Sequence, residues 1–269
     1  MISGVKTSQG YSAFTLSEVL IVLAIIGIIS SITIPSIIAN VERNRFDNLI
    51  KKSYSTISEA LKRTTVNNGN IPIGCYYHKV NPYGSLVCVE YNELGICSRY
   101  TLLDGSPRPS DYYGNFDECA KFFEEFKKSL NIVKECAAGM AIADGCIAQY
   151  KGNDDVILEK NRLTNSMYSE LDAYRATSGC LGWHTSQFVS KEAIVLNNGM
   201  TLIPYANSFK SSPALFGIDV NGMQKPNKAG YDLHFFYIKG DSKSVAFYPG
   251  VCAYSEQGGK DTDLVLLGK

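Results

Sequence analysis

The chain has few of the residues and motifs by which enzymes and nucleic-acid-binding proteins are recognised. Its 269 residues include only three histidines and one tryptophan, and 26 basic side chains are balanced by 26 acidic ones. Because a phosphate-binding surface needs excess positive charge, this balance argues against nucleic acid as a specific partner. No G-x-S-x-G, phosphate-loop or H-E-x-x-H motif occurs. We therefore predict no catalytic residue and do not expect an enzyme.

The cysteines also lack a familiar metal-binding spacing. No C-x-x-C pair occurs, which argues against a zinc site. An even number of cysteines in an exported domain indicates disulfides, although the sequence does not fix their pairing. We predict a Cys136–Cys146 bridge, because these residues flank a short Gly/Ala-rich loop, and a Cys180–Cys252 bridge between the middle and C-terminal regions. The eight disulfide candidates are Cys75, Cys88, Cys97, Cys119, Cys136, Cys146, Cys180 and Cys252.

One long run of the sequence carries no charge. Residues 19–41 form a stretch of 23 uncharged, mostly apolar residues, and about 20 such residues span a bilayer as a helix. Gly27 and Pro35 interrupt the run, but both are tolerated in membrane helices. A secretory signal peptide has a shorter apolar region that ends in a small-x-small site. We therefore predict a transmembrane helix, for which a plain single-pass anchor is one interpretation.

Residues 13–20, AFTLSEVL, resemble the processing site of type IV prepilins and type II secretion pseudopilins. In that family a prepilin peptidase cuts before a Phe and methylates the new N-terminal amine. A Glu lies four residues after this Phe and a Pro commonly twenty-one residues after it, and Phe14, Glu18 and Pro35 have this spacing. The family usually has Gly before the cut, where this chain has Ala13, which is also small. The resemblance implies cleavage between Ala13 and Phe14.

Glu18 stands at the edge of the apolar run, where a carboxylate is costly. A nearby cation offsets such a cost. The resemblance implies that Glu18 neutralises the Phe14 amine of a neighbouring subunit, and that Glu18 and Pro35 belong to the assembly site of a filament. The alternative is a Glu that extends to the surface of the bilayer in a permanent anchor.

The charges that flank the run conflict with the expected orientation. Lys6 is the one charged side chain before residue 18, whereas four basic residues follow the run: Arg43, Arg45, Lys51 and Lys52. The positive-inside rule would place the C-terminal part in the cytoplasm, but long domains are exported largely regardless of charge. The cysteines and the resemblance both favour a single-pass protein of the cytoplasmic membrane, with its C-terminal domain extracytoplasmic and later in a periplasmic or cell-surface filament.

The sequence pattern predicts an α+β fold, with a long N-terminal helix packed on an antiparallel β-sheet domain. We expect a leader over residues 1–13, a transmembrane helix over 14–38, its amphipathic continuation over 39–68 and a globular, disulfide-containing domain over 69–269. Residues 71–116 look irregular, and helical spacing recurs over 117–133, with Asp117 as N-cap, and over 163–174. Strands are predicted over 193–196, 200–203, 215–220, 231–238 and 244–248. Asn198-Gly199 predicts a hairpin, and the short turns predict a meander.

One turn-rich stretch is a candidate calcium site. Asp219, Asn221 and Asp232 supply the hard oxygen ligands that Ca²⁺ prefers, and the stretch begins like an EF-hand loop. Its twelfth position is Gly230 rather than Glu, and ordinary turn chemistry is the alternative. No other cofactor is predicted. His234 shares a strand face with Asp232, which we expect to be solvated.

The resemblance implies a structural subunit of a type IV pilus-like or type II secretion pseudopilus filament. Its length and disulfide content favour a minor subunit, because the abundant repeating subunits of this family are usually smaller. The implied partners are the prepilin peptidase, other pilin or pseudopilin subunits, the inner-membrane assembly machinery and the membrane. The alternative is a membrane-tethered extracytoplasmic binding protein or adhesin with the same anchor. A tethered enzyme is a third hypothesis, which no motif supports.

Overall fold

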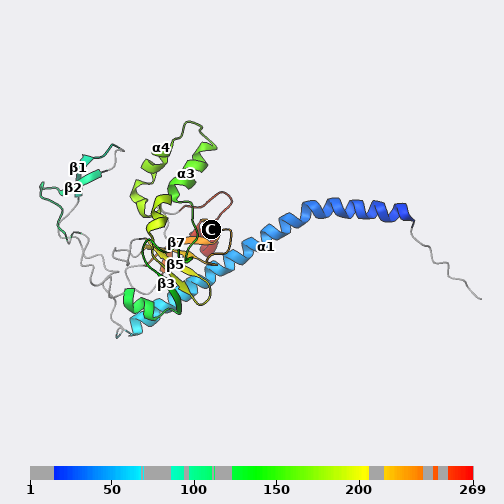
Figure 1. Ribbon diagram of the computed structural model, residues 1–269, viewed down its shortest axis with the longest axis horizontal. Helices are drawn as coiled ribbons and strands as arrows, with labels where there is room; N and C mark the ends of the chain where they lie inside the picture. The colour runs from blue at the N-terminus through cyan, green and yellow to red at the C-terminus, as the bar shows by residue number, and fades with distance from the viewer. Residues whose placement is uncertain are drawn as a thin grey trace, which may run out of the picture. The chain divides into compact units, whose positions relative to one another are not determined.

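The computed structural model describes residues 15–67, 69, 86–93, 97–110, 112, 123–205, 215–238, 245–247 and 254–268. The chain divides into two compact units, Met1–Arg45 and Phe46–Lys269. A long N-terminal helix followed by antiparallel sheets gives the α+β, pilin-like arrangement that the sequence predicts (Figure 1).

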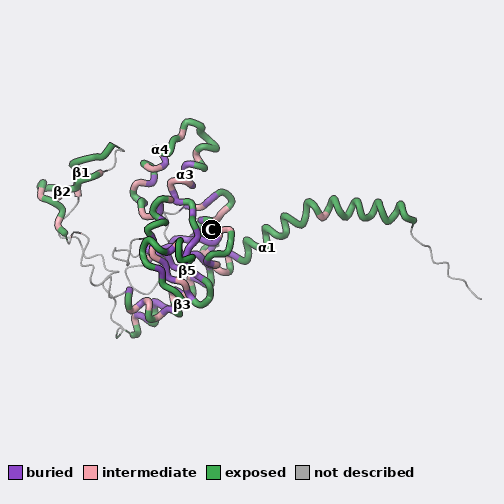
Figure 2. Tube along the Cα trace, in the orientation of Figure 1, coloured by how far each residue is buried: buried purple, intermediate pink, exposed green. Residues whose placement is uncertain are grey.

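The helix α1, Leu16–Asn67, is continuous and ends within one residue of the position expected from the sequence. Its first part is apolar on all sides. Nearly all residues of this part are exposed (Figure 2). Within the described residues, α1 is the one helix long and apolar enough to cross a membrane. From Phe46 onward the apolar residues narrow to a single buried stripe that includes Ile50, Ile57 and Leu61. The second part is therefore amphipathic, as a helix packed on a domain should be.

Six strands form an antiparallel meander in the order β3-β4-β5-β6-β7-β8. Each strand pairs with the next one along the chain, which confirms the predicted topology. The strands are β3 (Ile132–Cys136), β4 (Ala193–Leu196), β5 (Thr201–Pro204), β6 (Leu215–Asp219), β7 (Leu233–Ile238) and β8 (Val245–Phe247).

The predicted hairpin joins β4 to β5 through a three-residue turn. The Leu196 N–H donates to the Met200 carbonyl (2.8 Å), and the Gly199 N–H donates to the Leu196 carbonyl (2.9 Å). Gly199 has a φ of 83°, a left-handed conformation that glycine adopts without steric cost. A turn closed by a left-handed residue is a common three-residue hairpin form.

Both faces of the sheet are covered, because successive side chains of a strand point to opposite faces. On β5, Leu202 packs in the apolar cluster that contains the buried stripe of α1, whereas its neighbour Ile203 packs in a second cluster. On β7, Phe236 and Phe235 divide in the same way. The second cluster contains Trp183, which comes from the segment 137–192 inserted between the paired strands β3 and β4.

The inserted segment contains two short α-helices and two 3-10 helices: α3 (Asn153–Arg162), α4 (Glu170–Ala176), η2 (Ser178–Trp183) and η3 (Thr185–Ser190). The predicted helix over 163–174 is wrong in position. A capping box begins α4 in the middle of that window. Asp172 N–H donates to Ser169 Oγ (3.2 Å), and Ser169 N–H donates to Asp172 Oδ2 (2.9 Å). Such a box is a strong local start signal, which here overrides the apolar spacing.

The predicted helix over 117–133 is also too long. The described residues are helical over 123–128, and the N–H groups of Ser129 and Leu130 close the last turn. Ile132 then begins β3 and pairs with Leu196, because strand pairing with β4 satisfies the backbone that a longer helix would have used. Asp117 lies outside the described residues.

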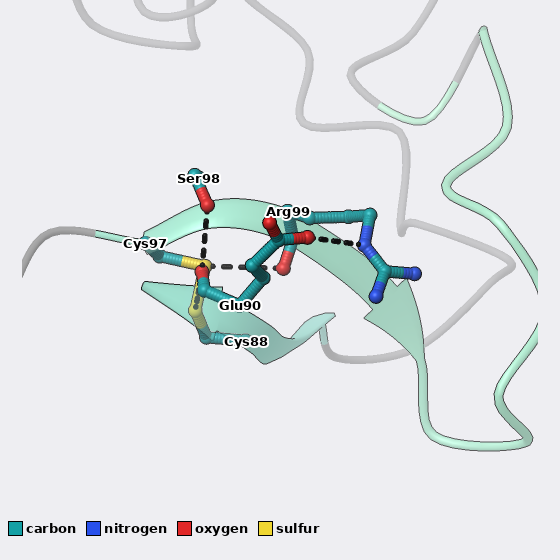
Figure 3. Close-up of a disulfide and its surroundings, with 5 residues drawn as sticks. All are labelled: Cys88, Glu90, Cys97, Ser98 and Arg99. Atoms are coloured by element: carbon teal, nitrogen blue, oxygen red, sulfur yellow. Dashed lines mark hydrogen bonds and ion pairs between the residues drawn. A yellow bond between two sulfur atoms is a disulfide. The ribbon is translucent and has the colours of Figure 1, made fainter. Parts of the chain in front are cut away.

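A second, two-stranded sheet occurs where irregular structure is expected from the sequence. β1 (Leu86–Tyr91) and β2 (Cys97–Leu102) pair in antiparallel fashion. A disulfide joins Cys88 to Cys97, and Arg99 Nε donates to Glu90 Oε2 at 2.9 Å (Figure 3). An isolated hairpin is marginally stable in water, so the disulfide is a direct reason for its persistence.

The predicted Cys136–Cys146 disulfide is present and closes the start of the inserted segment. Cys180 is also disulfide-bonded. Its predicted partner, Cys252, lies outside the described residues, as do Cys75 and Cys119. The helix α5 (Thr262–Leu267) ends the described chain. Just before it, Lys260 Nζ contacts Asp47 Oδ2 on α1 at 2.7 Å.

Candidate functional site

The start of α1 is organised by Thr15 and Glu18. The Thr15 N–H and the Thr15 hydroxyl each donate to Glu18 Oε2 at 2.8 Å. In return, the Glu18 N–H faces Thr15 Oγ1 at 3.3 Å. These reciprocal bonds form a capping box, which satisfies N–H groups that the first helical turn leaves unpaired. Ala13 and Phe14, the residues of the predicted cleavage site, lie outside the described residues.

The capping box gives Glu18 a local role that the sequence analysis missed. Thr-x-x-Glu directly before an apolar run is the sequence pattern of such a box. An acidic side chain in the first turn also interacts favourably with the positive end of the helix dipole. Glu18 is therefore held at the helix start within its own chain, before any neighbouring subunit is considered.

Inside the apolar run two polar side chains are hydrogen-bonded within the helix. The Ser31 hydroxyl donates to the Ile28 carbonyl (2.7 Å), and the Thr33 hydroxyl donates to the Ile29 carbonyl (2.9 Å). Pro35 lies within α1 and has no N–H, so the Ser31 carbonyl lacks its usual helical partner. Hydrogen bonds within the helix, such as those of the Ser31 and Thr33 hydroxyls, are what a lipid environment requires of polar groups.

The structure brings Asp219 and Asp232 together in a buried turn beside β6 and β7. Both side chains are 0% exposed. Asp232 accepts the N–H groups of Asn227 and Lys228, each at 2.7 Å. Asp219 accepts the Asn221 N–H at 3.0 Å and the Tyr150 hydroxyl, which comes from the inserted segment. All four carboxylate oxygens thus already have a donor from the protein.

Burial and mutual repulsion control the charge of this pair. Burial, with the charge of Asp232 as a second cause, raises the pKa of Asp219 to about 7. Burial also raises the pKa of Asp232. Two adjacent buried carboxylates attract a proton or a cation. Asn221 Oδ1 is buried without a hydrogen-bond partner among the described residues, so it is the oxygen here with most capacity to bind a cation.

The fit to calcium is incomplete. No group of three or more His, Cys, Asp or Glu side chains in the described part of the chain is placed to hold a metal ion, and calcium takes six to eight oxygen ligands. The hydrogen bonds account for the turn without a metal. Calcium at Asp219, Asn221 and Asp232 therefore stays a prediction.

His234 is not on a solvated face, so that expectation is wrong. It is 1% exposed, with Nδ1 3.1 Å from Thr262 Oγ1 and Nε2 3.2 Å from the Tyr231 carbonyl. Burial lowers the pKa of His234 to about 4, so its ring is neutral at pH 7. The side chain connects β7 to α5. His234 lies on the same strand face as Phe236, which packs in the apolar cluster of α1. This face is covered by α1 and α5, so alternation along the strand was misleading.

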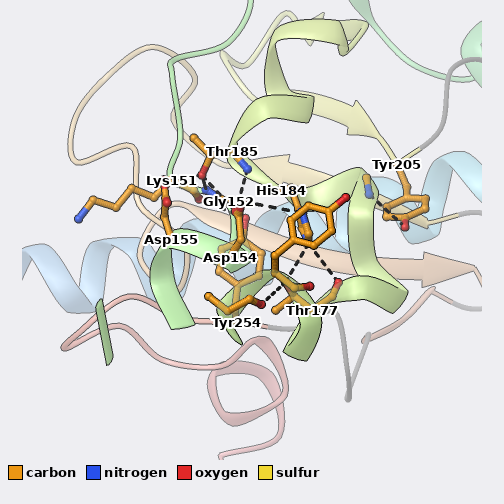
Figure 4. Close-up of polar contacts among 12 residues, drawn as sticks. Lys151, Gly152, Asp154, Asp155, Thr177, His184, Thr185, Tyr205 and Tyr254 are labelled. Atoms are coloured by element: carbon orange, nitrogen blue, oxygen red, sulfur yellow. Dashed lines mark hydrogen bonds and ion pairs between the residues drawn. The ribbon is translucent and has the colours of Figure 1, made fainter. Parts of the chain in front are cut away.

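A second buried histidine connects parts of the inserted segment. His184 Nε2 lies 2.8 Å from Thr177 Oγ1, and its Nδ1 lies 3.8 Å from Asp154 Oδ2 (Figure 4). The order Thr-His-Asp matches that of a hydrolase triad, but Thr177 is 0% exposed and its hydroxyl also donates to the Ala173 carbonyl at 2.8 Å. Because the Thr177 hydroxyl is buried and already hydrogen-bonded, the contacts of this group connect α3 to the end of α4.

Comparison with known proteins locates one family feature. Residues 9–34 match the prokaryotic N-terminal methylation motif. No curated protein and no solved structure matches the chain. The match covers the predicted cleavage site, the capping box and most of the apolar run, and the globular unit lies beyond it.

The chain therefore carries the prepilin-type methylation motif that is typical of type IV pilins and pseudopilins. With the apolar α1 and the antiparallel sheet, this motif indicates a pilin- or pseudopilin-like protein, the kind of protein that a prepilin peptidase processes. The same features indicate a membrane-anchored, extracytoplasmic protein. The family is generally not enzymatic.

Proposed function

We propose that the protein is a minor structural subunit of a type IV pilus-like or type II secretion pseudopilus filament. The observation that carries the proposal is the first part of α1. Side chains such as Leu20, Ile28 and Ile37 are 58%, 63% and 59% exposed, directly after a prepilin-type cleavage motif. A helix that is apolar all round needs either lipid or other helices around it. In this proposal lipid surrounds it before assembly and neighbouring subunits surround it afterwards.

In the proposed mechanism, the peptidase removes residues 1–13 and methylates the amine of Phe14. The carboxylate of Glu18, held by Thr15 at the helix start, then neutralises the Phe14 amine of a neighbour and sets the register between subunits. Pro35, which has no N–H, removes one backbone hydrogen bond from the helix inside the bundle. The inner-membrane assembly machinery and other pilin or pseudopilin subunits are the proposed partners, and residues 14–38, 39–68 and 69–269 act as span, continuation and exported domain.

Intact-mass measurement of the protein from cells with an active prepilin peptidase tests the processing step. We expect a chain that starts at a singly methylated Phe14. A chain that keeps residues 1–13 under these conditions would contradict the proposal.

Assembly is tested by comparing Glu18→Ala with the wild-type protein. The variant should insert in the membrane in the wild-type amount and enter sheared filaments much less well. Equal incorporation of the two proteins would remove the register role from Glu18.

A further inference from the structure

A small polar pocket lies beside the second part of α1. It has a volume of about 220 Å³ and is formed by α1, by residues 129–131 and by the turn between β4 and β5. All of its lining residues belong to the unit that begins at Phe46. Neither the methylation motif nor the acidic turn contributes to it.

The pocket combines an apolar inner wall with a polar rim. The inner wall consists of Ala60, Leu130 and Leu196, which are 3%, 8% and 2% exposed. The rim carries five planar polar side chains, each with donors, acceptors or both at fixed angles. These are Glu59, Arg63, Asn131, Asn197 and Asn198.

Hydrogen bonds connect the elements that carry the rim. The Asn197 N–H donates to the Asn131 carbonyl at 2.9 Å, which joins two walls of the pocket. Asn198 Oδ1 accepts the Met200 N–H at 3.1 Å. Arg63 pairs with Glu59 one helical turn away. The backbone of the rim is therefore held in place, while the amides of Asn131 and Asn197 face the pocket from exposed positions.

We propose that this pocket binds one sugar ring of an extracytoplasmic saccharide. Adjacent sugar hydroxyls each donate and accept, so amide, carboxylate and guanidinium groups match them in pairs. The C–H face of the ring fits the apolar inner wall. Since no aromatic side chain lines the pocket, stacking is absent and single rings bind weakly.

A second hollow extends the site. It has a volume of about 340 Å³ and shares Glu59, Arg63, Ser129 and Asn131 with the first. A saccharide of two or more rings therefore binds more tightly than a single ring. The proposal rests on the proposed function only for the extracytoplasmic location, where saccharides are available.

The test uses the purified full chain in a detergent without a sugar headgroup. Saturation-transfer NMR is recorded with methyl glycosides of glucose, galactose and mannose, with N-acetylglucosamine, and with lactose as a two-ring probe. We expect transfer to at least one probe. Asn131→Ala and Asn197→Ala should each weaken that binding about fivefold, the usual effect of losing one hydrogen bond.

Asn48→Ala is the matched control, because Asn48 is an exposed asparagine on α1 that does not line the pocket. Fluorescence of Trp183, the single tryptophan, verifies that each variant is folded. The proposal is overturned if no probe receives saturation, if both pocket variants bind like wild type, or if Asn48→Ala weakens binding as much as they do. Binding is measured on the isolated protein, so failure here leaves the filament proposal intact.

Discussion

The two parts of α1, before and after Phe46, differ in how far they are buried. In the first part, Ile25 is 51% exposed and no described element covers the apolar run. In the second part, Ile57 is 0% exposed and packs in the larger apolar cluster. Both parts are helical because leucine, isoleucine and alanine permit a helix in either environment. What differs is burial: the second part packs in the core beside the sheet, whereas the first part is exposed and, in the proposed function, is covered by lipid or neighbouring subunits.

The sheet, like the second part of α1, is covered by other segments of the same chain, one of which is the inserted segment 137–192. One face of the strands is covered by α1 and the other by the cluster around Trp183. The globular unit thus buries the apolar side chains on both faces of its own sheet. The apolar side chains in the first part of α1 are exposed. This asymmetry is what a subunit needs if its domain must be stable in water and its helix must exchange lipid for neighbours.

The largest expected effect comes from truncating a buried isoleucine in the second part of α1. The same truncation in the exposed first part is the comparison. Ile57→Ala should lower the free energy of unfolding of the globular unit by about 2–5 kcal/mol, because it leaves a cavity in a packed core. Ile25→Ala should change that quantity by less than about 0.5 kcal/mol. Denaturant unfolding of the full chain in detergent, followed by the fluorescence of the buried Trp183, measures both.

Equal losses in the two variants would break the comparison, because the first part of α1 would then be packed against the domain. The matched substitution keeps helix propensity and side-chain volume constant between the two sites. The pair therefore separates burial from any general effect of alanine.

The next effect concerns the acidic turn and depends on pH. The pKa of Asp219 is raised from 3.8 to about 7, so its stabilising contribution is complete below about pH 4 and is lost as the pH rises through 7. Between pH 5 and pH 8 the wild-type protein should lose about 2–3 kcal/mol relative to Asp219→Asn. Trp183-monitored unfolding of both proteins at the two pH values measures this difference.

His234 contributes a pH dependence of the opposite sign. Its pKa is lowered from 6.5 to about 4, so its effect is a loss of stability as the pH falls from about 6.5 towards 4. The effect is present in both proteins and cancels in the comparison.

Adding calcium at pH 8 tests the metal prediction. Stabilisation of the wild-type protein but not of Asp219→Asn would support a calcium site, and no stabilisation of either would leave turn chemistry alone.

The sequence predicted the elements that depend on residues close together along the chain, and it missed those that depend on distant ones. The uncharged run and the apolar stripe are local patterns, and they predicted α1 almost to its last residue. Asn198-Gly199 between apolar runs likewise predicted the β4–β5 hairpin. β3 was missed because its partner β4 follows only after the inserted segment, and no periodicity reports a pairing at that distance.

The candidate sites follow the same rule. The methylation motif is contiguous and was found from residues 13–20 and the spacing to Pro35, and the Cys136–Cys146 bridge was found from its short loop. The burial of His234 was missed, because it depends on α5, which follows much later in the chain. The burial of Asp232 was missed, because it depends on how the turn folds over its carboxylate. The polar pocket was missed because it joins three elements that are far apart in the sequence.

The smallest expected effect is at the start of α1, and it tests whether the exposed part has any structure of its own beyond helix propensity. Thr15→Ala removes the oxygen that faces the Glu18 N–H, at a cost of about 1 kcal/mol for an N-cap. The Glu18 amide should then exchange with solvent about fivefold faster, while Thr15→Ser and Glu18→Gln, which both keep that oxygen, leave the rate at residue 18 near the wild-type value. Amide exchange by NMR on the full chain in micelles measures this rate. An unchanged rate in Thr15→Ala would mean that the helix start is fixed by its surroundings, and the first part of α1 would then depend on outside partners even for its end.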